Sequence, residues 1–261
     1  MFVDSHCHLD APHFDADRDA VMDAARAAGV GAFVVPATDA QSFSRIEALA
    51  SRHTDVLPAL GIHPLFVASA RDADLDVLDA HLAQPGIGGV GEIGLDGFVP
   101  EADPALQERF FVAQLRLARK HGLPVILHVR RAVDAVLKQL RRIEVPGGIA
   151  HAFNGSRQQA DQLLAMGFKL GYGGASTFSG SKRIRALAAE LPLEALVLET
   201  DAPDVPPSWA QDKRNEPANL LPIAEGIAGL RNMPVEHLAQ ETTRNACAAL
   251  PRLRRVLPGV A

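Results

Sequence analysis

Short apolar segments alternate with longer amphipathic segments from one end of the chain to the other. Eight apolar segments are candidate strands, and they lie near residues 2–6, 31–36, 56–62, 88–93, 124–128, 148–152, 168–172 and 196–201. The alternation predicts βα units around a parallel sheet. Eight such units in a chain of 261 residues fit an α/β fold, a single (β/α)8 TIM barrel that takes residues 1–261 as one domain.

Helix signals support this interpretation at two places. The segment 105–121 keeps a period of 3.6 residues, and Gly122 follows its end as a typical C-terminal signal. Its apolar positions are Leu106, Phe110, Ala113, Leu117 and Ala118. Ser156 and Gln159 have the spacing of a capping box that begins the next helix.

Composition narrows the class of protein. The chain is 48% hydrophobic with a formal net charge of −5 and no basic run, so phosphate recognition must come from a local site. No apolar run reaches the roughly 20 residues that span a bilayer, and the N-terminus has no signal-peptide pattern. We therefore expect a soluble, cytoplasmic protein with no membrane partner and no obligate protein partner. Cys7 and Cys247 form no disulfide framework, and Cys7 is expected to be buried.

Histidines gather where the predicted strands end. Five of the ten histidines lie at or next to these ends: His6, His8, His63, His128 and His151. By chance about one would be expected there, and this face of a barrel is where active sites are built. Glu92 and Asp201 occupy the same zone on their own segments. A carboxylate on an apolar strand is costly unless a cation or a donor meets it, so these residues indicate a metal site.

The segment Asp4-Ser5-His6-Cys7-His8 places two imidazoles near the first strand. Side chains alternate along a strand, so His6 and His8 are predicted to point one way and Cys7 the other. Two histidines on one face can share a metal ion. Imidazole and carboxylate together favour zinc or manganese over magnesium, although the identity of the metal stays open among the three.

The predicted ligands are too many for one tetrahedral ion. They are His6, His8, Glu92, His128, His151 and Asp201. Two divalent ions about 3.5–4 Å apart, bridged by a carboxylate, would use all of them. Glu92 is the better bridge because it comes from a middle strand. Asp201 lies on the last strand, beside the first, where it can orient or deprotonate the attacking water. Glu92 and Asp201 are therefore the predicted catalytic residues.

Three residues are candidate substrate contacts, each with a structural alternative. His63 can contact substrate near the metals or only hydrogen-bond its loop. Arg130 shares the strand face of His128 and can face a phosphate, or form a surface ion pair. Lys182 begins the helix after the seventh strand, where barrels commonly bind phosphate, or belongs to a solvated face. Glu199 shares the face of Asp201 and is expected to support a metal ligand or to pair deeper in the barrel.

The motifs resemble those of the TatD family of metal-dependent deoxyribonucleases, in the amidohydrolase-like barrel superfamily. The matching segments are Asp4-Ser5-His6-Cys7-His8-Leu9, Gly61-Ile62-His63-Pro64, Gly91-Glu92-Ile93-Gly94-Leu95-Asp96, His128, His151-Ala152-Phe153-Asn154-Gly155-Ser156, Glu199-Thr200-Asp201-Ala202-Pro203 and Arg214-Asn215-Glu216-Pro217. The resemblance implies that His6, His8, Glu92 and Asp201 hold one ion, and that Glu92, His128 and His151 hold the second. It also implies phosphodiester hydrolysis with exonuclease character.

Two departures from the family pattern concern the substrate groove. Gly97 precedes Phe98 where members often have an aromatic residue directly, and Val129 stands where serine is common. The substrate is therefore open among DNA, RNA and small phosphodiesters. Two other functions stay as alternatives: an amidohydrolase-type enzyme that cleaves amides, esters or lactones on the same metals, and a noncatalytic protein that kept the barrel.

Overall fold

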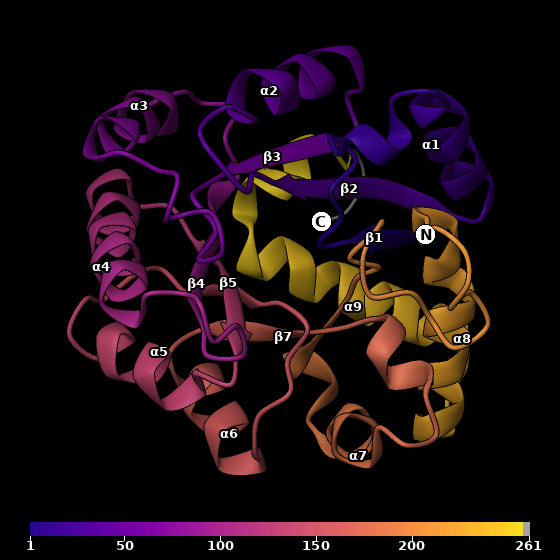
Figure 1. Cartoon of the computed structure of the whole chain (residues 1–261). Helices are drawn as coiled ribbons and strands as arrows, with labels where there is room; N and C mark the ends of the chain where they lie inside the picture. Colours follow the sequence, from indigo (N-terminus) through magenta and orange to yellow (C-terminus); the bar gives the residue numbers. More distant parts are fainter. Residues whose placement is uncertain (258–261) are drawn as a thin grey trace.

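The computed structural model describes residues 1–257, which contain eight strands in one parallel sheet ordered β1 to β8. Their bounds are β1 Phe2–Asp4, β2 Val30–Pro36, β3 Val56–Leu60, β4 Gly89–Asp96, β5 Val125–Arg130, β6 Gly148–Ala150, β7 Phe168–Tyr172 and β8 Leu196–Leu198. The Ser5 N–H donates to the Leu198 carbonyl at 2.9 Å, which joins the two ends of the sheet. The predicted (β/α)8 barrel is confirmed (Figure 1).

Helices surround the strands as a ring (Figure 1). Within residues 1–257 the α-helices are α1 Arg18–Ala27, α2 Phe43–Arg52, α3 Asp72–Leu82, α4 Pro104–His121, α5 Val133–Leu140, α6 Arg157–Ala165, α7 Lys182–Glu190, α8 Leu220–Arg231 and α9 Val235–Ala249. The predicted helix signals are confirmed. The Asp103 carboxylate caps α4, Gly122 ends it in the left-handed conformation, and Ser156 with Gln159 forms the capping box of α6.

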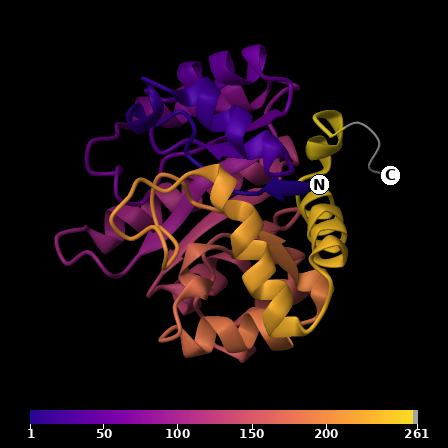
Figure 2. The same ribbon diagram turned by 90° about the vertical axis from the view of Figure 1, so that its right-hand side faces the viewer.

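The apolar residues form two cores. The larger core packs the outer faces of the strands against the surrounding helices. The smaller core lies inside the barrel, where Val34, Ile126 and Val197 pack with Cys247 and Leu250 at the end of α9. Helix α9 therefore crosses one end of the barrel, as Figures 1 and 2 show. With that end filled by apolar side chains, the polar residues gather at the other end, where the strands finish.

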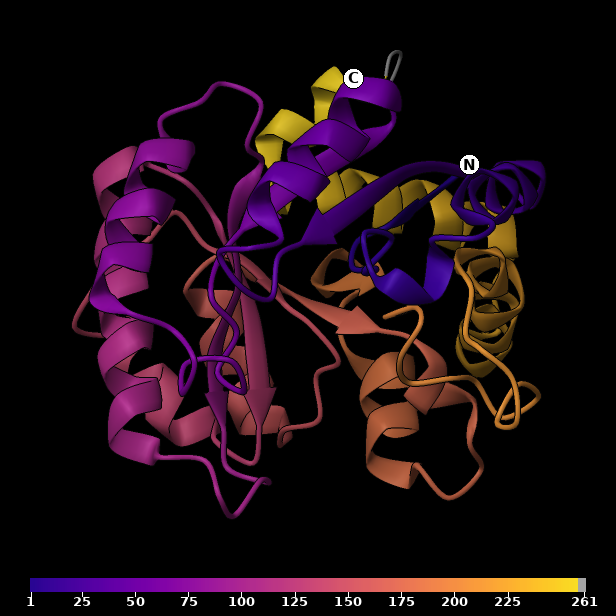
Figure 3. The same cartoon turned by 45° about the horizontal axis from the view of Figure 1, so that its top comes forward.

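Several strands end earlier than the apolar pattern suggests. The predicted strands 2–6 and 196–201 stop at Asp4 and Leu198. The chain turns out of the sheet at these points, and Asp201 has a left-handed φ of 57°. In contrast, β4 and β5 stay paired as far as Asp96 and Arg130, and this magenta pair projects beyond its neighbours (Figure 3).

No helix within residues 1–257 has both the length and the apolar character needed to cross a membrane. Cys7 is fully buried, as predicted, and its thiol faces the Val34 carbonyl. The cytoplasmic location stays a prediction.

Replacing Asp103 by alanine is expected to lower the free energy of unfolding by about 1 kcal/mol, because the N–H groups of Ala105 and Leu106 lose their acceptor. The matched control is Glu101→Ala, which removes an exposed carboxylate from the same loop. Urea denaturation of both variants measures the difference. Equal stability of the two would contradict the capping role.

Candidate metal centre

His6 and His8 lie just beyond the end of β1, in a segment that keeps its backbone hydrogen bonds. The Cys7 N–H donates to the Val34 carbonyl of β2, and the His8 N–H donates to the Ala202 carbonyl. The segment therefore stays extended although it is not part of the strand. The two Nε2 atoms come within 3.3 Å of each other, so the predicted pairing of the imidazoles holds.

A first group of four ligand atoms surrounds one point. It consists of His6 Nε2, His8 Nε2, Glu92 Oε2 and Asp201 Oδ1. The two nitrogens lie 3.1 and 3.6 Å from the Glu92 oxygen, and each lies 3.6 Å from the Asp201 oxygen. A tetrahedron of ligands about 2.1 Å from a zinc ion has edges of about 3.4 Å. The spacing fits a divalent ion of this kind.

A second group of ligand atoms faces the other oxygen of Glu92. His128 Nδ1 lies 2.8 Å from Glu92 Oε1, and His151 Nε2 and His63 Nε2 each lie 3.4 Å from it. His63 Nε2 is also 3.0 Å from His128 Nδ1. His63, which the sequence offered as a substrate contact, thus lies with Glu92 and His128 in a group that could hold a metal ion.

Glu92 is the centre of both groups. Its side chain is only 3% exposed, and its two oxygens face opposite sets of histidines. Burial raises the pKa of this carboxyl, but the charges of His63, His6 and His151 together with the His128 hydrogen bond outweigh burial and hold the pKa well below its usual range. Glu92 is therefore ionised and offers one oxygen to each side.

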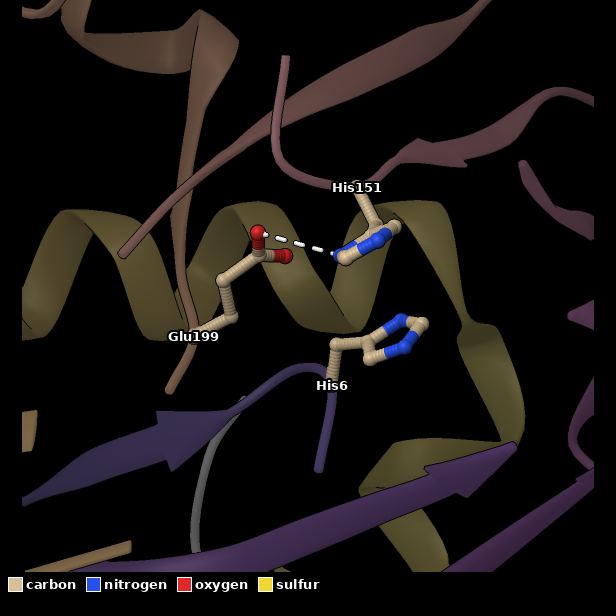
Figure 4. A group of neighbouring side chains, drawn as sticks. All are labelled: His6, His151 and Glu199. Atoms are coloured by element: carbon tan, nitrogen blue, oxygen red, sulfur yellow. Dashed lines mark ion pairs between the residues drawn. The ribbon is translucent and has the colours of Figure 1, made fainter. Parts of the chain in front are cut away.

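Two further carboxylates hold the histidines of the second group. Asp96 Oδ2 lies 2.9 Å from His128 Nε2, which turns the other ring nitrogen toward Glu92. Glu199 Oε1 lies 3.3 Å from His151 Nδ1 (Figure 4), whereas the other ring nitrogen, Nε2, faces Glu92. Carboxylates in these positions fix the orientation and the tautomer of metal-binding histidines. The supporting role expected for Glu199 agrees with this contact.

The buried Glu199 carboxylate needs space that only a glycine leaves. A Cβ at Gly171 of β7 would lie 2.1 Å from Glu199 Oε2. Glu199 Oε1 also accepts a hydrogen bond of 2.6 Å from the Ala152 N–H. The position of His151 is therefore set by groups from three strand ends.

The sequence analysis did not single out Asp96 as a functional residue. The sequence did contain a signal for this residue. Asp96 lies four residues after Glu92, and side chains alternate along a strand, so both residues are expected on the same face of β4. Burial raises the pKa of Asp96, but hydrogen bonds from His128 and from the N–H groups of Phe98 and Val99 outweigh it and hold the pKa at about 2. Asp96 therefore stays ionised beside His128.

Two cavities reach the centre from opposite sides. One of about 940 Å³ is lined mainly by residues that follow β4 to β7, and another of about 700 Å³ mainly by residues that follow β1, β2, β3 and β8. Both are lined by His128, His151, Arg130 and Asp201. Arg130 is thus next to the candidate metal ligands. Lys182 is exposed and lines neither cavity, whereas its neighbour Arg183 lines the larger one.

An eight-stranded barrel with clustered histidines and carboxylates at its strand ends is the architecture of a metal-dependent hydrolase. The family model "TatD related DNase" matches residues 3–251. The chain belongs to the TatD family of metal-dependent hydrolases, as the motifs indicated.

Relatives cover nearly the whole chain. The uncharacterized metal-dependent hydrolase YjjV of Escherichia coli K12 is 39% identical over 94% of this chain and 95% of its own length. Its crystal structure superposes with a TM-score of 0.92, over 96% of this chain and 98% of that one. Human deoxyribonuclease TATDN3 is 34% identical over 98% of this chain and 96% of its own. A TatD family hydrolase from Entamoeba histolytica, 19% identical, shares the fold with a TM-score of 0.84 over 95% of this chain and 97% of that one.

The affinity of the centre for a divalent ion is expected to fall as the pH falls. Burial raises the pKa of Asp201 to about 7. Burial lowers the pKa of His151, but the Asp201, Glu92 and Glu199 carboxylates outweigh it and raise the pKa to about 10. A bound proton competes with a cation. At neutral pH His151 must release its proton, and below about pH 7 Asp201 must release one as well.

Calorimetric titration with Zn²⁺ across this range measures the effect. The logarithm of the affinity should rise with pH on both sides of pH 7, and more steeply below pH 7, where Asp201 must also lose a proton. In the Asp201→Asn variant, the steeper dependence of the affinity on pH below pH 7 should disappear. An affinity that does not depend on pH would contradict the protonation states assigned to the centre.

Proposed function

We propose that the protein hydrolyses phosphodiester bonds of DNA with two divalent ions, one on each side of Glu92. The observation that carries the proposal is the division of the Glu92 oxygens, 3.1 Å from His6 on one side and 2.8 Å from His128 on the other. One carboxylate that bridges two ions is a recurring arrangement in phosphoesterases. The family model and the human relative, which is named a deoxyribonuclease, support the choice of substrate.

The donor set fits zinc or manganese, with magnesium less suited because imidazoles contribute most of the ligands. The proposed ligands are His6, His8, Glu92 and Asp201 for one ion, and Glu92, His128 and His151 for the other. When bound, such ions polarise a phosphoryl oxygen and lower the pKa of water. His63 Nε2 is close enough to join the second set or to contact the substrate there.

Asp201 is the proposed proton acceptor. It lines both cavities, so it can face the attacking water while its Oδ1 stays beside His6 and His8. Its left-handed φ of 57° directs the side chain toward the centre from the loop after β8. In the reaction the Asp201 carboxylate takes the proton of the water that attacks phosphorus.

Arg130 is the proposed partner of the phosphate. It lines both cavities, and within residues 1–257 no carboxylate forms an ion pair with it. An unpaired guanidinium beside the centre favours an anionic substrate such as a phosphodiester over a neutral amide or lactone. Amide, ester or lactone hydrolysis on the same centre is the alternative, and exonuclease character stays a prediction.

Metal-dependent cleavage of end-labelled single-stranded and duplex DNA tests the function. Protein stripped with EDTA is expected to leave DNA intact, and added Mn²⁺, Zn²⁺ or Mg²⁺ should restore stepwise shortening. Asp201→Asn should reduce the rate by about 10²–10⁴-fold, because the proton acceptor is lost. If DNA stays intact with every ion and the protein hydrolyses members of a panel of amides and lactones, the alternative function, hydrolysis of amides, esters or lactones, is favoured.

The two sets of ligands should respond differently to substitution. Glu92→Gln is expected to lower the affinity for both ions, since both would share this carboxylate. Asp96→Asn should lower only the affinity for the ion beside His128, by about 10–100-fold. Metal content by mass spectrometry and calorimetric titration separate the two effects. Asp76→Asn, an exposed change on α3, is the matched control. A Glu92→Gln protein that keeps both ions at parent affinity would contradict the bridging role.

A further inference from the structure

The larger cavity beside the metal centre has a basic wall. Arg130 is the last residue of β5, Arg131 follows it, and Arg183 comes from the first turn of α7. All three are exposed at the cavity of about 940 Å³. Besides the proposed ligand Asp201, the acidic residue on its lining is Asp134, which accepts a hydrogen bond from Gln159. The chain as a whole is acidic, so this local excess of arginine is not a consequence of composition.

Phe98 holds two of the arginines in place. The guanidinium carbon of Arg130 lies 3.6 Å from the centre of the Phe98 ring, and that of Arg131 lies 4.6 Å from it. Phe98 is 43% exposed, so it is a surface platform rather than part of the core. Stacking on an aromatic ring orients a guanidinium without neutralising its charge.

Gly97 explains how Phe98 reaches these arginines. Its N–H donates to the Arg130 carbonyl at 2.7 Å, and a Cβ at Gly97 would lie 2.9 Å from the Arg131 carbonyl oxygen. Only a glycine allows this close approach of the two backbones. The departure from the family pattern at Gly97 and Phe98 therefore builds the contact between the aromatic ring and the arginines.

Arg183 is held by a neutral partner. The Asn154 side-chain oxygen accepts hydrogen bonds from Arg183 Nε at 3.1 Å and from its terminal nitrogen at 2.8 Å. Other exposed arginines, such as Arg109 and Arg157, pair with aspartates. Within residues 1–257 no ion pair involves Arg130, Arg131 or Arg183. The wall therefore presents three oriented guanidinium groups, and no carboxylate within residues 1–257 neutralises them.

The second cavity has the opposite character. It is lined by Asp10, Asp39 and Asp204. Of its two arginines, Arg130 is shared with the larger cavity, and Arg45 pairs with Asp10 at 3.0 Å. A polyanion that reaches the centre would be attracted along the arginine wall and repelled on the acidic side. The charge difference thus distinguishes the two sides of the metal centre.

We propose that Arg131 and Arg183, held by Phe98 and Asn154, form a subsite for the phosphates of the uncleaved part of a single-stranded nucleic acid. The proposal rests on the proposed function, because it places the reacting phosphate at the metal centre and Arg130. The proposed ligands Glu92 and His151 line the cavities and are buried, so a strand must separate from its complement to reach them. Stacked guanidinium planes also accept unpaired bases.

Binding of a short fluorescein-labelled oligothymidylate, followed by anisotropy at several salt concentrations, tests the subsite. All proteins carry Asp201→Asn so that the strand is not consumed. Adding Arg131→Gln and Arg183→Gln should raise Kd by about a hundredfold, since each charge-assisted contact contributes about tenfold. The slope of log Kd against log salt should fall by about 1.4, because two phosphate contacts are lost. Arg116→Gln, an exposed change on α4, is the matched control and should bind like the parent.

Phe98 is a positioning residue in this scheme, and its variants separate positioning from folding. Phe98→Ala should weaken oligonucleotide binding, and Phe98→Tyr, which keeps the ring, should restore it. Because Phe98 is exposed, the thermal stability of both variants is expected to stay near that of the parent. Weak binding by Phe98→Tyr as well would overturn the stacking role.

The outcomes separate the subsite from the function. If the parent cleaves DNA but the double arginine variant binds it with unchanged affinity and salt slope, the subsite is wrong and the function stands. If DNA binds through these arginines but no ion supports cleavage, the function is wrong and the subsite stands. If the Asp201→Asn protein does not bind the oligonucleotide at low salt, the subsite is overturned.

Discussion

The structure depends on one buried carboxylate. Glu92 places a negative charge where almost no water reaches, and such a charge costs several kcal/mol unless cations or donors surround it. His6 and His128 approach its two oxygens from opposite sides, and Asp96 and Glu199 in turn hold the histidines of the second group. Near neutral pH the protons on His151 and Asp201 offset part of the negative charge, and a divalent ion would take the place of these protons.

The barrel makes this concentration of charge possible because its two ends have different chemistry. Helix α9 fills one end with apolar side chains, so polar groups are confined to the other end. There the loops after β1 and β8 stay joined by main-chain hydrogen bonds, and Asp4 accepts from the backbone N–H and the hydroxyl of Thr200. These contacts hold Asp201 beside His6 and His8. Rigid strand ends thus supply the ligands, and the longer loops supply the walls of the cavities.

The sequence predicted the strands, the α4 helix and the capping box because these follow from local periodicity and capping chemistry. It also predicted that the six proposed ligands lie together at one end of the barrel, because all of them lie at or just beyond the ends of parallel strands. It did not predict the supporting role of Asp96 or the arginine wall. Arg131 has a left-handed φ of 54°, and the direction of such a side chain depends on the loop path and on tertiary contacts such as that with Phe98.

Crystals soaked in Mn²⁺ and measured for anomalous scattering would test the central claim most directly. The account predicts two peaks about 3.5–4 Å apart, one bounded by His6, His8 and Asp201 and the other by His128 and His151, with the Glu92 carboxylate between them. A single peak at saturating metal, or two peaks that do not share Glu92, would contradict it.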